Sequence, residues 1–166
     1  MAKTRDLTSD YHWAIGRLFA ETGKLDTALT NYIAALTGLH IVEAVILVHH
    51  QQFANKLDSV KALARLQFAD EQAWERHPLK EILIRAKSVG DFRNTLAHAI
   101  WTFEEGSDVP LAVKFSARGK FDRSRKPVPI EDIQQKTLEA IELVGSLNSY
   151  AQAAHLSRTP DLQEKT

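Results

Sequence analysis

Residues 9–36 read SDYHWAIGRLFAETGKLDTALTNYIAAL, and this stretch decides the fold class. Its apolar side chains recur at steps of three and four, which places them on one face of an α-helix: Ile15, Leu18, Phe19, Leu25, Leu29, Tyr32, Ile33 and Leu36, with Thr22 in the same row. The row keeps its phase through Gly23, although glycine inside a helix costs roughly 1 kcal/mol relative to alanine. We therefore predict one helix over residues 9–36, capped by Thr8 or Ser9; two helices broken at Gly23 are the alternative.

The helical spacing continues downstream in shorter segments. Helices are predicted over residues 40–48 and 52–67, the second with inward-facing Phe53, Leu57, Val60, Leu63, Ala64 and Leu66. Asp70 is suited to cap the next helix, and Pro78 either begins or kinks one because proline has no N–H to donate. Beyond it, an apolar row predicts a helix that runs to about Phe103: Leu79, Ile82, Leu83, Ala86, Val89, Leu96 and Ile100.

The pattern changes after residue 108. Residues 109–116 and 120–128 read as two extended runs on either side of Ala117-Arg118-Gly119, which predicts a β-hairpin. Pro127 and Pro129 end the hairpin, and Ile130 opens a last helix with inward-facing Ile133, Leu138, Ile141, Val144, Leu147 and Ala151. The predicted fold is all-α, an up-and-down helical bundle with a β-hairpin inserted before the last helix. One domain is expected over residues 1–157, with residues 158–166 as a disordered polar tail.

Composition narrows the classes of function. The chain has 166 residues, and its 21 basic residues balance 21 acidic ones, which argues against non-specific coating of nucleic acid. The absence of cysteine excludes disulfides, thiolate metal sites and cysteine catalysis. The N-terminus lacks the apolar core of a signal peptide, and the longest apolar run, residues 41–48, is too short to cross a bilayer. We therefore expect a cytoplasmic protein without membrane association, and the scattered histidines predict neither a metal site nor another cofactor.

One short stretch, residues 91–101, concentrates groups that can carry chemistry; it reads DFRNTLAHAIW. On a helix, Asn94 and His98 share a face because they lie four residues apart, and the long stem of Arg93 can bring its guanidinium to the same opening. A guanidinium can hold a phosphate through two parallel hydrogen bonds, an imidazole can transfer a proton near neutral pH, and an amide can orient the group under attack. The spacing alone is weak evidence for a catalytic site, since a solvated Arg and a half-buried His with no catalytic role can have the same spacing.

The string Arg-Asn-x-Leu-Ala-His, followed closely by Trp, resembles the signature of the HEPN superfamily, in which a polar residue usually follows the Arg and a His lies four to six residues after it. HEPN domains are helical bundles with the motif in a late helix, as predicted here. The resemblance covers residues 91–101 specifically and the helical body only loosely.

The resemblance implies a metal-independent endoribonuclease that acts as a homodimer, with two motifs facing each other across a cleft. His98 would be the general acid or base, Arg93 the phosphate clamp and Asn94 the positioning residue. The ribose 2′-hydroxyl would attack the adjacent phosphate and leave a cyclic phosphate end. Such an enzyme could be the toxin of a toxin–antitoxin pair, with an antitoxin protein as partner, or another stress or defence component. The alternatives are a non-catalytic interaction or ligand-sensing module and a plain structural bundle.

The predicted hairpin is locally basic. Residues 114–126 contain six basic residues against Asp122 alone, a net charge of +5, in a chain whose total charge is zero: Lys114, Arg118, Lys120, Arg123, Arg125 and Lys126. These side chains could bind RNA phosphates, or they could be edge charges that keep a hairpin soluble.

Overall fold

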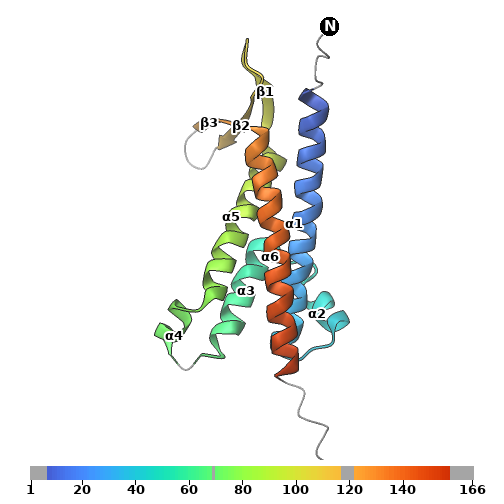
Figure 1. The fold of residues 1–166 in the computed structure, drawn as a ribbon, viewed down its shortest axis with the longest axis vertical. Helices are drawn as coiled ribbons and strands as arrows, with labels where there is room; N and C mark the ends of the chain where they lie inside the picture. Colours follow the sequence, from blue (N-terminus) through green and yellow to red (C-terminus); the bar gives the residue numbers. More distant parts are fainter. Residues whose placement is uncertain (1–6, 69, 117–121, 158–166) are drawn as a thin grey trace, which may run out of the picture.

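The computed structural model describes residues 7–68, 70–116 and 122–157, although the side chains of 7, 8, 115, 116 and 122 are outside the description. Within these ranges the chain forms six helices and a small sheet (Figure 1). The helices are α1 (Leu7–Thr37), α2 (Ile41–Val48), α3 (Phe53–Arg65), α4 (Glu71–Glu75), α5 (Pro78–His98) and α6 (Ile130–Leu156). The strands are β1 (Ile100–Phe103), β2 (Pro110–Ser116) and β3 (Asp122–Pro127).

The helices form an elongated bundle with the sheet at one end (Figure 1). The first and last helices, α1 and α6, lie side by side and run in the same direction. Leu18 and Ile133 share a cluster near the sheet, and the Tyr32 and Tyr150 rings lie 6.1 Å apart towards the other end. Helix α5 runs the opposite way, because its Arg85 reaches Glu142 whereas its later Ser88 reaches the earlier Lys136. The predicted all-α bundle with inserted strands is confirmed.

The predicted long first helix is confirmed. Helix α1 continues through Gly23 for 31 residues, so the alternative of two helices is wrong. Its apolar row is buried as predicted, with Leu18, Leu25 and Leu29 fully inaccessible to solvent. The helix begins at Leu7, so Thr8 and Ser9 lie inside it. The prediction that one of these two residues caps the helix is therefore wrong.

Side-chain caps set where the middle helices begin. Asp70 caps α4 as predicted, since its Oδ1 accepts a hydrogen bond from the Ala73 N–H at 2.7 Å. Pro78 is the first residue of α5, where a missing N–H costs nothing, and His77 Nδ1 accepts from the Leu79 N–H at 3.2 Å. Pro78 therefore begins a helix and does not kink one.

The prediction that the motif helix runs to Phe103 is wrong. Helix α5 ends at His98, Ala99 is extended, and Ile100–Phe103 forms β1, which pairs antiparallel with β2. The hairpin of β2 and β3 is confirmed, but it belongs to a three-stranded sheet in the order β1-β2-β3. A β-branched and aromatic run favours strand, and four residues are too few for periodicity to distinguish it from helix. The Trp101 indole N–H donates to the Leu96 carbonyl at 3.3 Å, so it satisfies one of the unpaired acceptors at the helix end.

Two hydrophobic clusters lie along the bundle. The larger joins all six helices around the fully buried Leu29 and Trp74, and the smaller joins the start of α1, the end of α5, the sheet and the start of α6 around Leu18. Three residues predicted to face inward are exposed instead: Leu66, Leu138 and Ile141. Leu66 follows the end of α3. Leu138 and Ile141 flank a narrower buried stripe of α6 than the sequence suggested, since its centre is Thr137 and Ala140.

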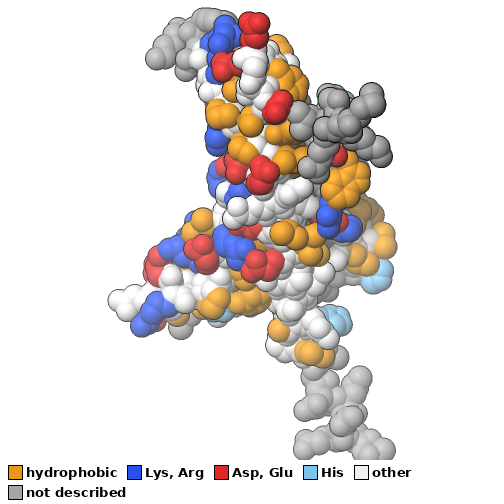
Figure 2. Space-filling view, turned by 45° about the horizontal axis from the view of Figure 1, so that its top comes forward, with side chains coloured by type: hydrophobic (Ala, Val, Ile, Leu, Met, Phe, Trp, Pro, Cys, Tyr) orange, Lys and Arg blue, Asp and Glu red, His pale blue; other side chains and the backbone are white. Residues whose placement is uncertain are grey.

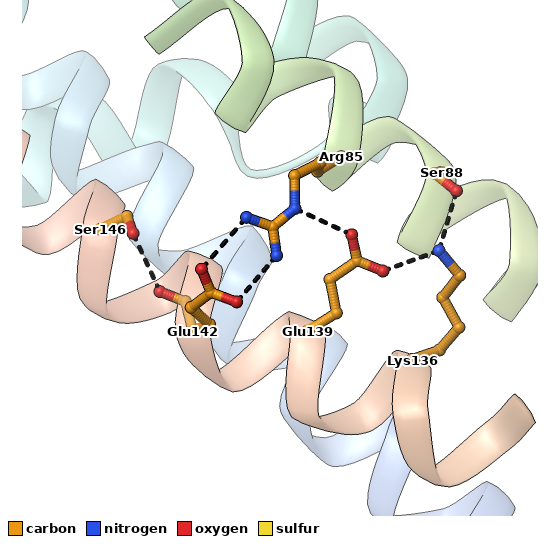
Figure 3. Close-up of polar contacts among 6 residues, drawn as sticks. All are labelled: Arg85, Ser88, Lys136, Glu139, Glu142 and Ser146. Atoms are coloured by element: carbon orange, nitrogen blue, oxygen red, sulfur yellow. Dashed lines mark hydrogen bonds and ion pairs between the residues drawn. The ribbon is translucent and has the colours of Figure 1, made fainter. Parts of the chain in front are cut away.

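A polar network fixes the crossing of α5 and α6 (Figure 3). The guanidinium of Arg85 donates to Glu139 at 3.1 Å and, through two nitrogens, to both oxygens of Glu142 at 3.1 and 2.8 Å. Lys136 bridges Glu139 and the Ser88 hydroxyl at 2.7 and 3.0 Å. The hydrogen bonds from Arg85 lower the pKa of Glu142. Partial burial raises the pKa of Glu139, but the hydrogen bonds from Lys136 and Arg85 outweigh it, and the net shift is downward.

We expect Arg85→Gln to lower the free energy of unfolding by up to about 1 kcal/mol at pH 7, the scale of partly exposed ion pairs. Carboxylates whose pKa is lowered in the folded protein contribute stability above the pKa of the unfolded chain and lose it as pH falls. The difference between wild type and variant should therefore shrink as pH falls below about 4.3. Urea unfolding at several pH values measures it. Lys87→Gln, which removes the exposed pair with Asp91, is the control and should change little. A difference independent of pH would contradict the ion-pair account.

Candidate functional site

Arg93 and Asn94 line a pocket of about 270 Å³ between α1, α3 and α5. The remaining lining residues are Thr22, Gly23, Asp26, Phe53 and Gly90. The pocket lies where the two hydrophobic clusters meet, because Phe53 packs against the larger cluster and Phe92, next to Arg93, packs against the smaller. Two of the three residues of the sequence-predicted motif thus lie in a concave site built by helices distant along the chain.

The Arg93 side chain is held by an aromatic ring and an amide. Its guanidinium carbon lies 4.6 Å from the centre of the Phe19 ring, and one nitrogen donates to Asn94 Oδ1 at 3.1 Å. Among the described residues Arg93 forms no ion pair with a carboxylate, unlike Arg85 in the network above. The stacking and the amide contact orient a half-buried guanidinium whose remaining N–H groups can meet an anion.

His98 lies apart from this pocket. It is the last residue of α5, its side chain is exposed, and it is not among the residues that line the pocket. It is one helical turn beyond Asn94 on the same face, as the spacing of four predicts. The structure therefore brings Arg93 and Asn94 together and places His98 at the outer edge of the same surface, at the start of the sheet.

Two charged residues were not predicted from the sequence: Asp26, which lines the pocket, and its ion-pair partner Lys56. Lys56 Nζ lies 2.6 Å from Asp26 Oδ2, and the Lys56 side chain is only 5% exposed, whereas the Asp26 side chain is 37% exposed. Lys56 falls in the inward row of α3 between Phe53 and Val60, a position that calls for a partner because a buried ammonium needs compensation. The position of Lys56 in that inward row could have indicated that it needs a partner. No pattern in the sequence identifies Asp26 on α1 as that partner.

The predicted RNA-binding residues do not form one continuous surface. Arg118 and Lys120 lie outside the described residues. Cross-strand partners share a face of a sheet, and the register therefore puts Arg123 and Arg125 on one face and Lys114 and Lys126 on the other. The second face is turned towards the bundle, since Ala112 lies on it and packs in the smaller cluster. Lys114 donates to the Thr95 hydroxyl at 3.0 Å, so it ties the sheet to the motif helix.

A second surface feature lies at the other end of the bundle, over α2. Five large apolar side chains of this short helix are 40–67% exposed: Ile41, Val42, Val45, Ile46 and Leu47. Figure 2 shows hydrophobic side chains and histidines gathered on the side of the molecule where α2 lies. We call these five residues the α2 apolar patch.

The described ranges contain no group of three or more His, Asp or Glu side chains placed to hold a metal ion. No single described helix is both long and apolar enough to cross a membrane; the pair of α1 and α2 passes on length and composition only when joined, and it bends by 117°.

A comparison with known protein families, curated proteins and solved structures finds no match for this chain.

Proposed function

We propose that this protein is a metal-independent endoribonuclease of HEPN type, active as a homodimer. The observation that carries the proposal is the Arg93 guanidinium, oriented in a pocket by Phe19 and Asn94 without a carboxylate partner among the described residues. An oriented arginine that no carboxylate neutralises fits a phosphate, which it can hold with two parallel bonds. An exposed imidazole one turn further along the same helix supplies the proton-transfer group.

In the proposed reaction the ribose 2′-oxygen attacks the adjacent phosphorus while His98 of one protomer takes its proton. The bond from phosphorus to the 5′-oxygen breaks, and His98 of the partner subunit donates a proton to that oxygen. The products are a 2′,3′-cyclic phosphate and a free 5′-hydroxyl. Arg93 stabilises the charge that develops on the phosphoryl oxygens, and Asn94 keeps the guanidinium in place.

The experiment that tests the proposal is incubation of purified protein with a mixed-sequence RNA in EDTA, followed by analysis of the product ends. Cyclic phosphate ends that form in the presence of chelator, and at a rate that follows protein concentration, support it. Intact RNA across varied sequences and structures would exclude it.

The dimer is proposed to bring the motifs together through α1. Beside the pocket this helix exposes two small residues, Gly16 and Ala20, over which a second helix can approach closely. Because α1 and α5 are antiparallel and Arg93 stacks on Phe19, His98, further along α5, is directed towards the start of α1 from Phe19. A two-fold axis near Ala20 would thus place two imidazoles on one cleft.

We expect Ala20→Arg to convert the dimer to a monomer in light scattering and to abolish cleavage, because the bulky charge separates the protomers. Ile46→Arg, on the α2 apolar patch, is the matched control and should leave the dimer intact. If Ile46→Arg dissociates the dimer and Ala20→Arg does not, the protomers meet through α2 and the facing-motif arrangement is wrong.

Arg123, Arg125 and Lys126 are proposed to contact RNA outside the pocket; all three are exposed on β3, an edge strand with the two arginines on one face and Lys126 on the other. Changing the three to Gln should weaken RNA binding and reduce the steepness of its salt dependence, by up to about one unit of log–log slope per lost phosphate contact. Filter binding at several salt concentrations measures both quantities. An unchanged slope would leave these residues as charges that keep the sheet edge soluble.

A ligand-binding module without catalysis is the second candidate. The observation that favours it is the absence of His98 from the pocket that holds Arg93 and Asn94. The same RNA assay separates the two functions, because a binding module would leave RNA intact.

A further inference from the structure

We propose that the pocket beside Arg93 binds a guanine base, so that the protein selects RNA with guanine next to the cleaved phosphate. The RNA part of this inference rests on the proposed function, whereas binding of the base itself does not. The pocket is lined by groups from three helices: Asp26 on α1, Phe53 on α3, and Arg93 and Asn94 on α5.

The Asp26 carboxylate sets the hydrogen-bonding pattern. Lys56 donates to its Oδ2, which holds the carboxylate in place, and within the described part of the chain Oδ1 has no hydrogen-bond donor. A carboxylate only accepts, so the edge of a base that meets it must donate. Guanine presents two adjacent donors, N1–H and the N2 amino group. Adenine and cytosine each offer an amino group beside an acceptor, and uracil offers one N–H between two acceptors.

Asn94 completes the match. Its Oδ1 accepts from Arg93, and among the described residues its NH₂ group has no acceptor. That group can donate to the O6 atom of guanine, which adjoins N1–H on the same edge. Asp26 and Asn94 thus offer the acceptors and the donor that a guanine edge requires, and both line one pocket.

The shape of the pocket also suits one planar ring. At about 270 Å³ it is below the range of about 300–1,000 Å³ typical of drug-sized ligands, which fits a single base. Phe53 provides an aromatic wall for stacking, and single-stranded RNA bases are commonly bound in this way. Gly90 allows the Phe53 ring to pack closely against α5, since a Cβ there would come within 2.6 Å of the ring. Gly23 leaves space beside the pocket that it lines, because a Cβ there would meet nothing within 4 Å.

The test measures binding of the four ribonucleoside 3′-monophosphates by calorimetry, which needs no cleavage. We expect guanosine monophosphate to bind most tightly. Asp26→Asn should lower the preference for guanine over adenine by about tenfold or more, the discrimination typical of a bidentate contact. Since Asp26→Asn leaves buried Lys56 without its partner, the double variant Asp26→Asn/Lys56→Met, which removes both charges, should show the same loss with the fold intact.

A variant that fills the pocket provides an independent test of the proposal. Gly23→Met should fill the pocket and eliminate binding of all four nucleotides, while the helix gains stability because an exposed glycine is replaced. Gly145→Met is the matched control. Gly145 is also an exposed helical glycine with open space around it, but it does not line the pocket. Thermal unfolding verifies that each variant is folded.

Three results of the binding experiments would overturn the proposal: equal binding of the four bases, a guanine preference that survives in the folded double variant, or binding that Gly23→Met leaves unchanged. RNA cleavage without preference for guanine would overturn it and leave the proposed ribonuclease standing. Guanine binding that depends on Asp26, in a protein that cleaves no RNA, would support the guanine site and overturn the proposed ribonuclease.

Discussion

Replacing His98 with alanine is expected to lower the rate of RNA cleavage by about 100- to 10,000-fold, the usual contribution of general acid–base catalysis. In the proposed dimer the effect should lie at the upper end, because the substitution removes both imidazoles of a cleft at once. The side chain is exposed at the end of α5, so its loss removes no packing from either hydrophobic cluster, and thermal unfolding should hardly change. The measurement is the single-turnover cleavage rate in EDTA as a function of pH.

His50→Ala is the matched control, since His50 is an exposed histidine beyond the end of α2. It should cleave RNA as wild type does. If His98→Ala and His50→Ala cleave equally well, His98 carries no proton in the reaction and the binding module becomes the better account. Mixing His98→Ala subunits with wild-type subunits adds a second readout: if each imidazole has its own role, a mixed dimer should lose nearly all its activity.

The long helices were predictable because their apolar rows are long. The row of α1 from Ile15 to Leu36 extends over about six turns, enough to override Gly23, and the resulting helix has nearly the predicted bounds. The prediction failed for β1 because Leu96 and Ile100 keep helical spacing across a boundary that tertiary structure sets. Pairing with β2 is a contact between segments about ten residues apart, and periodicity along α5 contains no information about it.

The candidate site likewise has one part that the sequence predicted and another that only the structure shows. Arg93, Asn94 and His98 are adjacent in sequence, and their helical spacing predicted a shared surface. Asp26 and Phe53 reach the pocket from 67 and 40 residues before Arg93, through the packing of α1 and α3 against α5. Residue types alone did not predict that packing, and so the acceptor that defines the proposed base specificity became visible only in the folded chain.

Arg93→Ala is expected to reduce cleavage by about 100- to 1,000-fold, the effect of removing one well-placed donor from a developing charge. The fold should survive. The stacking on Phe19 is worth about 0.5–1 kcal/mol at a partly exposed site, and among the described residues no carboxylate loses an ion-pair partner. Arg17→Ala is the matched control, because its guanidinium also stacks on an aromatic ring, 5.4 Å from the centre of Trp13, but outside the pocket.

Arg93→Lys separates charge from geometry. Lysine retains the positive charge but cannot form two parallel bonds to a phosphate or hold the flat contact with Phe19. If Arg93 acts through orientation, Arg93→Lys should recover little of the activity lost in Arg93→Ala; if it acts only as a nearby charge, recovery should be nearly complete. The loss should appear mainly in kcat, because the phosphate acquires its additional negative charge in the transition state. Cleavage by Arg93→Ala at the rate of Arg17→Ala would mean that Arg93 only packs against Phe19, and the proposed phosphate site would have to be abandoned.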